Sequence, residues 1–363
     1  MNRPPCDPCA IAARFALPGR VLDAEPLGGG HIHDTFVATV SPVERFVLQR
    51  LNERVFPDLD GLMENLGRVT RHLQAQGAPH ALTLVPTADG DDWLRDGEGR
   101  AWRAFRLVPG AVSRNGVDTP PEACAVAAAF GDFQRRLADL PGPPLHEHLP
   151  GFHDGAARLR SLQDIAAADP CGRAASSRAE LACALEHAHL AGLFADLGRL
   201  GAVPGIVHND TKPDNLLRDA ATGAPLCVID LDTVMPGWRL ADFGDLARAA
   251  CCRAPEDERD LSRMQADADL FAGLARGFLH AAGPLCAPAE RSALPDAAMA
   301  IVWEQGVRFL ADWLAGDTYY AVHRPGHNLD RCRAQFALLR SLSRQADDLR
   351  ARVARILDEQ ETA

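Results

Sequence analysis

The sequence predicts an α+β fold of two lobes, a small β-rich lobe over residues 1–107 and a larger, mainly helical lobe over residues 108–363. Before Pro109, short apolar runs alternate with clusters of Gly, Pro and Asp, which is typical of strands joined by turns. After Pro120, the chain is rich in Ala and Leu at helical spacing. A length of 363 residues also suits two domains better than one.

The first lobe contains one clear helical pattern among its expected strands. Leu62, Leu66, Val69 and Leu73 recur at intervals of three and four residues and predict a helix over residues 59–76. Strands are expected before and after this helix, because β-rich runs bounded by turn residues occur at 20–27, 33–40, 45–51, 81–86, 91–95 and 101–108. The first lobe is therefore expected to be a sheet with one prominent helix.

The second lobe is expected to be built from helices, with one interruption. Its first helix begins at Pro120 and Pro121, since proline is favoured in the first turn. Further helices are expected at about 178–200, 240–252, 257–282, 296–315 and 333–359. Between residues 206 and 232 the pattern changes to short apolar strands linked by polar turns. Ligand clefts favour interfaces between lobes, so this polar segment is the first place to look for a site.

The charge and the apolar pattern exclude several classes of protein. The formal net charge is -11, which argues against a general nucleic-acid binder or a binder of anionic membranes. No apolar run approaches the length of a membrane span, and the N-terminal residues lack the apolar core of a secretory signal. Ten cysteines are scattered through the chain, as expected for reduced thiols. A cytoplasmic location, with neither a membrane nor a nucleic-acid partner, is therefore expected.

The stretch from 205 to 234 contains a concentrated set of polar residues. It has the spacing H-x-D-x-K-x-x-N, followed by an apolar strand and two further carboxylates; the residues are His208, Asp210, Lys212, Asn215, Asp230 and Asp232. Lys212 is the single lysine among 38 basic residues. His208 by itself is more typical of a hydrogen-bonded structural histidine than of a catalytic one.

These residue types suit phosphoryl transfer from a nucleotide. That reaction needs a group to orient and deprotonate the acceptor hydroxyl, oxygen ligands for Mg²⁺ and positive charge near the phosphates. Asp210 can be the base, while Asn215 and Asp230 can be the Mg²⁺ ligands. Lys212 can offset the developing negative charge. The order of Asp, Asn and a strand-end Asp matches the catalytic set of kinases.

The same residues carry a resemblance to a known family. HNDTKPDN at 208–215, CVIDLDTVMPG at 227–237 and DFGDLAR at 242–248 resemble the aminoglycoside phosphotransferase and choline kinase family. GGGHIHDTF at 28–36 and HRPGHNLDRCRAQF at 323–336 extend the likeness over nearly the whole chain, and are most similar to the N-acetylhexosamine 1-kinases of that family.

The resemblance implies a protein-kinase-like fold that binds ATP and Mg²⁺. It implies that Asp210 is the catalytic base and that Asn215 and Asp230 bind Mg²⁺, with Asp232 supporting them. The implied reaction transfers a phosphoryl group from ATP to the 1-hydroxyl of an N-acetylhexosamine, GlcNAc or GalNAc, and yields the α-1-phosphate and ADP. The expected partners are the sugar and the nucleotide, and the protein is expected to be a monomer or a homodimer.

The first lobe departs from the kinase pattern at two places. The expected strand at 45–51 has Gln49 and Arg50 where a kinase has lysine, and strand alternation lets only one of them face the cleft. We expect Arg50 to contact the phosphates, with a surface position as the alternative, and Glu64 to pair with whichever residue faces the cleft. The expected phosphate loop is not a G-x-G-x-x-G, and it can equally form a tight hairpin; its glycines are Gly28, Gly29 and Gly30.

Three residues are candidates for contact with the sugar. Arg308 lies among apolar neighbours in a predicted helix, so it is either paired in the core or reaching into a pocket. The resemblance favours a sugar contact for it. His31 and Asp34 follow the glycine turn and can reach the sugar from above the cleft, or they can stabilise the turn.

Two alternative functions remain open. The same fold can phosphorylate an aminoglycoside, choline or an amino alcohol, but a cationic acceptor needs an acidic pocket. Residues 301–340 contain four acids against five arginines, which favours a neutral sugar. A non-catalytic nucleotide-binding protein would normally have lost the base or a metal ligand, whereas Asp210, Asn215 and Asp230 are all present.

Overall fold

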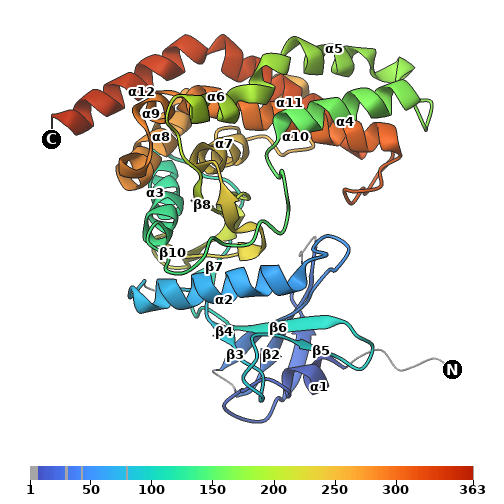
Figure 1. Ribbon diagram of the computed structural model, residues 1–363, viewed down its shortest axis with the longest axis vertical. Coiled ribbons are helices and arrows are strands. Elements are labelled where there is room, and N and C mark those ends of the chain that lie inside the picture. The colour runs from blue at the N-terminus through green and yellow to red at the C-terminus, as the bar shows by residue number, and fades with distance from the viewer. Residues whose placement is uncertain (1–6, 29–31, 42–43, 79–80, 363) are drawn as a thin grey trace.

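The computed structural model describes residues 7–28, 32–41, 44–78 and 81–362 (Figure 1). It confirms the predicted two-lobed α+β fold. A small antiparallel sheet forms the first lobe, and a larger helical lobe lies beside it. One long helix, α2 (Leu59–Ala75), lies between the sheet and the larger lobe (Figure 1).

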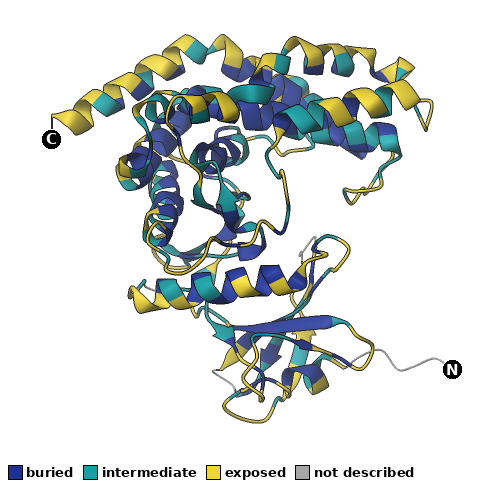
Figure 2. Ribbon diagram, viewed as in Figure 1, coloured by how far each residue is buried: buried dark blue, intermediate teal, exposed yellow. Residues whose placement is uncertain are grey.

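The sheet of the first lobe is antiparallel throughout. Its strands run in the order β1-β2-β3-β6-β4, and β5 also pairs with β6. Their bounds are β1 (Asp23–Pro26), β2 (Asp34–Thr39), β3 (Arg45–Arg50), β4 (Leu84–Val85), β5 (Leu94–Arg95) and β6 (Ala101–Arg106). The central strand β6 is buried over five of its six residues (Figure 2). The short helix α1 (Pro8–Ala12) covers one face of the sheet, and α2 covers the other.

Alternation along β3 assigns each of its side chains to one face of the sheet. Phe46 and Leu48 pack into the core that includes α1, while Val47 packs against the core of α2. Successive strand residues point to opposite faces. Gln49 therefore shares the α2 face with Val47, and Arg50 shares the α1 face with Leu48.

The core beneath α2 contains residues of both lobes. Leu66 of α2 and Phe105 of β6 belong to the same apolar cluster as Phe133, Leu231 and Val234 of the larger lobe. Burial of this shared surface resists separation of the lobes, because each apolar side chain removed from water stabilises the packed arrangement. Residues 231–234, which directly follow Asp230 in the sequence, are thus part of the interface between the two lobes.

Helices form most of the larger lobe around the central α10 (Leu294–Ala315), which Figure 2 shows as buried. It packs against α4, α7 and α11. The other helices are α3 (Pro120–Leu137), α4 (Gly155–Ala168), α5 (Arg178–Glu186), α6 (Leu193–Arg199), α7 (Arg239–Ala250), α8 (Ala268–Ala282), α9 (Pro288–Ser292), α11 (His327–Arg344) and α12 (Ala346–Glu361). Within the residues that the structure describes, no helix is long and apolar enough to cross a membrane.

Two small sheets of the larger lobe position the polar segment. The strands β8 (Gly205–Val207) and β11 (Met235–Gly237) form one pair. The hairpin of β9 (Leu216–Asp219) and β10 (Pro225–Val228) is extended by β7 (Ala111–Val112). The loop after β8 and the turn after β10 therefore meet at the face of the larger lobe that receives α2 and β6.

Several predicted helix bounds in the larger lobe are wrong. Residues 257–267 precede a helix instead of forming one, since the side chain of Asp267 caps α8 by accepting hydrogen bonds from the N–H groups of Asp269 and Leu270. The predicted helices at 178–200 and 333–359 are each broken into two. Helix α4 was missed because it buries only Gly155 and Leu162, too few residues for a recognisable apolar stripe.

Candidate active site

The loop after β8 is held in place by a buried carboxylate of α7. Asp242 accepts hydrogen bonds from the backbone N–H of His208 at 2.9 Å and of Asn209 at 2.7 Å. Gln134 of α3 donates a third, also at 2.7 Å. These bonds support Asn209 in the left-handed region, at φ +65°. Asp242 therefore anchors the loop that carries Asp210.

His208 has the structural role expected of it. Its side chain is fully buried between the rings of Phe130 and Phe133. Nε2 donates to the carbonyl oxygen of Ile229 at 2.9 Å, and Nδ1 lies 3.3 Å from the backbone N–H of Asp210, which donates to it. One buried ring thus connects the catalytic loop to the residue before Asp230.

The structure brings the predicted catalytic residues together. Lys212 Nζ lies 3.1 Å from Asp210 Oδ2. Asn215 Nδ2 donates to the same oxygen at 2.9 Å and to the Asp210 carbonyl at 2.8 Å, so its own Oδ1 is left for another partner. Burial would lower the pKa of Lys212, but the charges of Asp210, Asp214 and Asp245 outweigh it and raise that pKa. The ammonium group is therefore firmly protonated beside the proposed base.

Asp230 lies next to Asn215, because the N–H of Ile229 donates to the Asn215 carbonyl at 2.9 Å. Desolvation, together with the charges of Asp232 and Asp210, raises the pKa of Asp230 to about 7. A carboxylate close to other carboxylates is stabilised by a cation, and oxygen ligands suit Mg²⁺. No group of three His, Cys, Asp or Glu side chains in the described part of the chain is arranged as a metal site. Mg²⁺ at Asn215 and Asp230 would therefore need additional ligands, such as phosphate oxygens.

The structure does not support the predicted role of Asp232 at the metal. Arg103 of β6 holds both oxygens of the Asp232 carboxylate, with Nη2 at 2.7 Å from Oδ2. His33 Nε2 lies 2.7 Å from the same Oδ2. Burial would raise the pKa of Asp232, but the charge of Arg103 and the hydrogen bond from His33 hold it well below its usual range. With both oxygens already bound to cationic or N–H groups of the first lobe, Asp232 joins the lobes instead.

The predictions for Arg50, Asp34 and Glu64 are also wrong. Arg50 faces the α1 side of the sheet, where it forms an ion pair with Asp34, its register partner on β2. Gln49 takes the cleft-facing position and accepts a hydrogen bond from Arg103 Nε at 2.9 Å. Glu64 pairs with His146 of the larger lobe at 2.8 Å, so it has no cationic partner on β3.

The glycine-rich segment is described only in part. Gly28 lies in an exposed turn after β1. Gly29, Gly30 and His31 lie outside the described residues, so their predicted contacts stay predictions.

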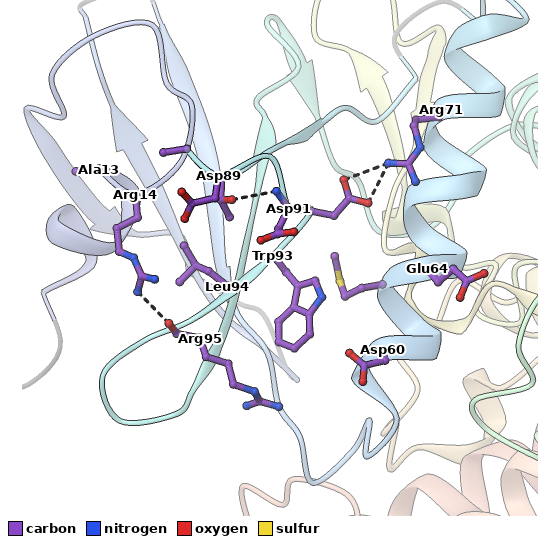
Figure 3. Close-up of a pocket in the computed structure, with 14 residues that line it drawn as sticks. Ala13, Arg14, Asp60, Glu64, Arg71, Asp89, Asp91, Trp93, Leu94 and Arg95 are labelled. Carbon is purple, nitrogen blue, oxygen red and sulfur yellow. Dashed lines mark hydrogen bonds and ion pairs between the residues drawn. The ribbon is translucent and has the colours of Figure 1, made fainter.

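A large cavity of about 900 Å³ lies in the first lobe, away from this chemistry (Figure 3). It is formed between the end of α1, the exposed face of α2 and the turn before β5. Glu64, Asp89 and Asp91 stand beside Trp93 and Arg95 on its wall. Residues of the catalytic loop do not line it, so we place the candidate active site at Asp210 and not here.

Arg308, predicted to contact the sugar, is a half-buried arginine of α10. The Arg308 guanidinium lies 5.4 Å from the ring centre of Phe152 and 5.7 Å from that of Tyr320, and it donates to Gln305 Oε1 at 3.1 Å. Among the described residues it forms no ion pair. Arg308 also lines a cavity of about 230 Å³ with residues of α4 and of segment 318–320. A cation with aromatic and amide neighbours can bind an uncharged oxygen-rich ligand.

The acceptor side also contains a second charged group between Arg308 and the catalytic loop. Asp245 of α7 is buried and pairs with Arg248 at 2.8 Å, and its Oδ2 has no hydrogen-bond partner in the structure. Burial would raise the pKa of Asp245, but Arg248 and Lys212 hold it below its usual range. Burial would lower the pKa of Arg248, but the charges of Asp245 and Glu256 and, more weakly, that of Asp210 raise it. These groups therefore lie in one electrostatic environment with the proposed base.

Sequence reasoning missed His33 and Arg103, and it kept Gln49 only as the alternative to Arg50 at the cleft. A signal existed for Arg103, an arginine within AWRAFR, a strand otherwise suited to burial on both faces. No such signal marked its partner, which lies 129 residues away in the sequence.

The fold and this arrangement of Asp210, Lys212, Asn215 and Asp230 define a kinase-like small-molecule phosphotransferase. A family model described as the phosphotransferase enzyme family, APH, matches residues 23–283, and the chain belongs to that family.

Solved structures agree with this fold. An aminoglycoside phosphotransferase from Alicyclobacillus acidocaldarius aligns over 100% of this chain and 98% of its own, at 19% identity and a TM-score of 0.57. A microcompartment-associated aminopropanol kinase aligns over 95% and 98%, at 15% identity and a TM-score of 0.58. Amicoumacin kinase, in complex with AMP-PNP, Ca²⁺ and its ligand, aligns over 90% and 91%, at 14% identity and a TM-score of 0.59.

Proposed function

We propose that the protein transfers the γ-phosphoryl group of ATP to the anomeric 1-hydroxyl of an N-acetylhexosamine, GlcNAc or GalNAc, and forms the α-1-phosphate and ADP. The observation that carries phosphoryl transfer is the convergence of Asp210, Lys212 and Asn215 near Asp230, whose pKa the charges of Asp232 and Asp210 help to raise. The sequence likeness to N-acetylhexosamine 1-kinases and the environment of Arg308 support the sugar.

Asp210 would act as the general base. Its carboxylate would accept the proton of the anomeric hydroxyl as the oxygen attacks the γ-phosphorus and the bond to the ADP oxygen breaks. An anomeric hydroxyl is more acidic than an ordinary alcohol, so a carboxylate suffices, and such assistance is typically worth about 10²–10⁴-fold in rate. Lys212, 3.1 Å from Asp210, would favour the ionised base and offset negative charge as it develops.

Asn215 and Asp230 would hold Mg²⁺. The donor set fits the ion, because the amide oxygen of Asn215 is not used by Asp210 and the Asp230 carboxylate lies within the electrostatic influence of two other acids. Bound Mg²⁺ would neutralise charge on the phosphate oxygens. The complex of amicoumacin kinase with AMP-PNP and Ca²⁺ supports nucleotide and divalent-ion binding on this fold.

The environment of Arg308 favours a neutral acceptor over a cationic one. A half-buried guanidinium that forms no ion pair among the described residues repels a second cation, and at an effective dielectric constant near 20 two charges 4 Å apart interact by about 4 kcal/mol. Choline and protonated amino alcohols would meet this repulsion. The carbonyl and hydroxyl oxygens of an N-acetylhexosamine would instead accept hydrogen bonds from Arg308.

The test is ADP release in the presence of ATP and Mg²⁺, across GlcNAc, GalNAc, glucose, choline and kanamycin. Asp210→Asn provides the background for each acceptor. We expect turnover with the two N-acetylhexosamines and a product phosphate that is released by mild acid, as an anomeric phosphate is. Turnover only with choline or kanamycin would retain the Asp210 chemistry and reject the sugar, while turnover with none would reject the proposal. Size-exclusion chromatography of the same preparation would test the expected monomer or homodimer, and cell fractionation the cytoplasmic location.

A further inference from the structure

Asp232 is the point at which the first lobe is attached to the segment that carries Asp230. We refer to His33, Arg103 and Asp232 as the lobe anchor. All three are at least nine-tenths buried, at 7%, 2% and 2% exposure. Arg103 binds both carboxylate oxygens of Asp232, and His33 binds Oδ2 at 2.7 Å.

The protonation of the anchor follows from its hydrogen bonds. The backbone N–H of Asn52 donates to His33 Nδ1 at 3.0 Å, so Nδ1 carries no proton. The proton of the neutral ring is therefore on Nε2, which donates it to Asp232. The single positive charge at Asp232 comes from Arg103, and the two form a charge-neutral buried pair. Asp230 is then the carboxylate that is left without a cationic partner of its own.

The anchor connects parts of the first lobe that are distant in the sequence. His33 directly precedes β2, while Arg103 lies on β6. Gln49 of β3 accepts a hydrogen bond from Arg103 Nε at 2.9 Å, which fixes the guanidinium from the sheet side. Arg103 is the only buried arginine of the first lobe in the described ranges. It therefore supplies the cleft-facing positive charge that β3 does not provide.

The segment after Asp230 is held from the other side as well. His148 Nε2 donates to the Asp232 carbonyl at 2.7 Å. Asn65 of α2 donates to the Val234 carbonyl at 3.2 Å, and Asn209 Nδ2 donates to that of Thr233 at 2.8 Å. Only one residue separates Asp232 from Asp230, whose backbone has the left-handed φ of +58°. A shift of the Asp232 side chain would thus move the Asp230 carboxylate.

We propose that Asp232 is a positioning residue, which through His33 and Arg103 fixes the sheet of the first lobe relative to Asp230, the carboxylate proposed to bind the metal. The inference rests on the proposed function for the identity of the ligand, MgATP. In this arrangement the sheet of the first lobe and the proposed metal ligand move as one unit. Breaking the anchor would therefore weaken the binding of MgATP more than that of metal-free ATP.

The test measures nucleotide affinity by calorimetric titration of the full-length protein, with ATP in Mg²⁺ and with ATP in EDTA. The variants are Asp232→Asn, His33→Ala and Arg103→Met, each with its melting temperature. Outer-shell partners of metal ligands typically contribute about 10–100-fold to metal affinity, so we expect a loss of about tenfold or more for MgATP. In EDTA we expect a clearly smaller loss. The conservative variants His33→Gln and Arg103→Lys keep a donor to Asp232 and should recover much of the lost affinity.

Arg218→Met is the matched control. Arg218 is fully buried and forms an ion pair with Glu122 within the larger lobe, so its loss removes a buried guanidinium of the same kind. It should lower the melting temperature without a selective loss of MgATP affinity. If the anchor variants only lose thermal stability, as this control does, or weaken ATP equally with and without Mg²⁺, the proposal is overturned.

The titration separates this inference from the proposed function. MgATP binding without turnover of any sugar would reject the sugar and leave the anchor test valid. A protein that does not bind MgATP at all would overturn both.

Discussion

Replacement of Asp242 by asparagine tests whether this one side chain holds the catalytic loop in place. The carboxylate accepts three hydrogen bonds, from the N–H groups of His208 and Asn209 and from Gln134 Nε2. Burial raises the pKa of Asp242, while these hydrogen bonds lower it in part. Asparagine has nearly the same shape, so the change alters hydrogen bonding without leaving a cavity.

The magnitude follows from the donors that asparagine cannot satisfy. Its amide offers one acceptor oxygen and one NH₂ group, so at least one backbone N–H of the loop faces another donor. Leaving a buried donor unpaired costs about 1–3 kcal/mol, and loss of a hydrogen bond to a charged group costs about 1.5–3 kcal/mol. We expect Asp242→Asn to lower the free energy of unfolding by about 3 kcal/mol. Asn209 would also lose its support in the left-handed region, which costs of order 1–3 kcal/mol to maintain.

The catalytic effect should be similar in size to the effect on stability. A displacement of about 1 Å in a reacting group can cost about 100-fold in rate, so we expect a fall in kcat of that order for Asp242→Asn. Urea unfolding measures the free energy of unfolding, and steady-state ADP release with the accepted sugar measures kcat. Asp96→Asn is the control, since Asp96 is a buried carboxylate of the first lobe that likewise accepts several hydrogen bonds. It should lower stability comparably and leave kcat close to the unaltered value. An Asp242→Asn protein with unchanged kcat and unchanged stability would refute the reasoning.

Three further predictions follow from the same structure. Asp210→Asn should lower kcat by about 10²–10⁴-fold with nucleotide affinity largely retained, and near-full activity in the ADP-release assay would show that Asp210 is not the base. Arg308→Gln should raise KM for the sugar by about tenfold, equivalent to about 1.4 kcal/mol, with KM for ATP unchanged; an equal change in both constants would argue against a sugar contact. Burial would raise the pKa of Asp96, but hydrogen bonds from Trp102 and Arg100 hold it well below its usual range. A depressed carboxyl pKa stabilises the fold above the unfolded-state pKa of about 3.9, so stability should fall as the pH drops below about 4, and less steeply in Asp96→Asn, as urea unfolding against pH would show.

The sequence predicted the two lobes and the local composition of the site well, because both depend on short-range patterns. Strand and helix patterns separate cleanly near residue 109, and the structure has that division. Asp210, Lys212 and Asn215 lie within six residues of one another, so a single loop brings them together whatever the rest of the chain does. Asp230 joins them through the neighbouring hairpin, which is also local.

The predictions that failed in the first lobe concern side chains whose contacts depend on which face of a strand they occupy. Gln49 and Arg50 are adjacent, so their side chains lie on opposite faces of β3. The orientation of the strand decides which of the two faces the cleft. Sequence alone did not decide between them, because both faces of this sheet are covered, one by α1 and the other by α2. Glu64 was assigned a partner on β3 for the same reason, although its position on α2 places it against His146.

By itself, the sequence determined which chemistry this chain carries, since the residues for phosphoryl transfer are encoded at fixed local spacing. Only the tertiary structure decided which contacts between the two lobes position these residues. Asp232 looks like a second metal-site carboxylate in the sequence, and only the pairing of β6 with the rest of the sheet brings Arg103 onto it from 129 residues away. A buried carboxylate is bound by whichever cation the fold packs against it, and that choice is made by long-range packing and not by spacing along the chain.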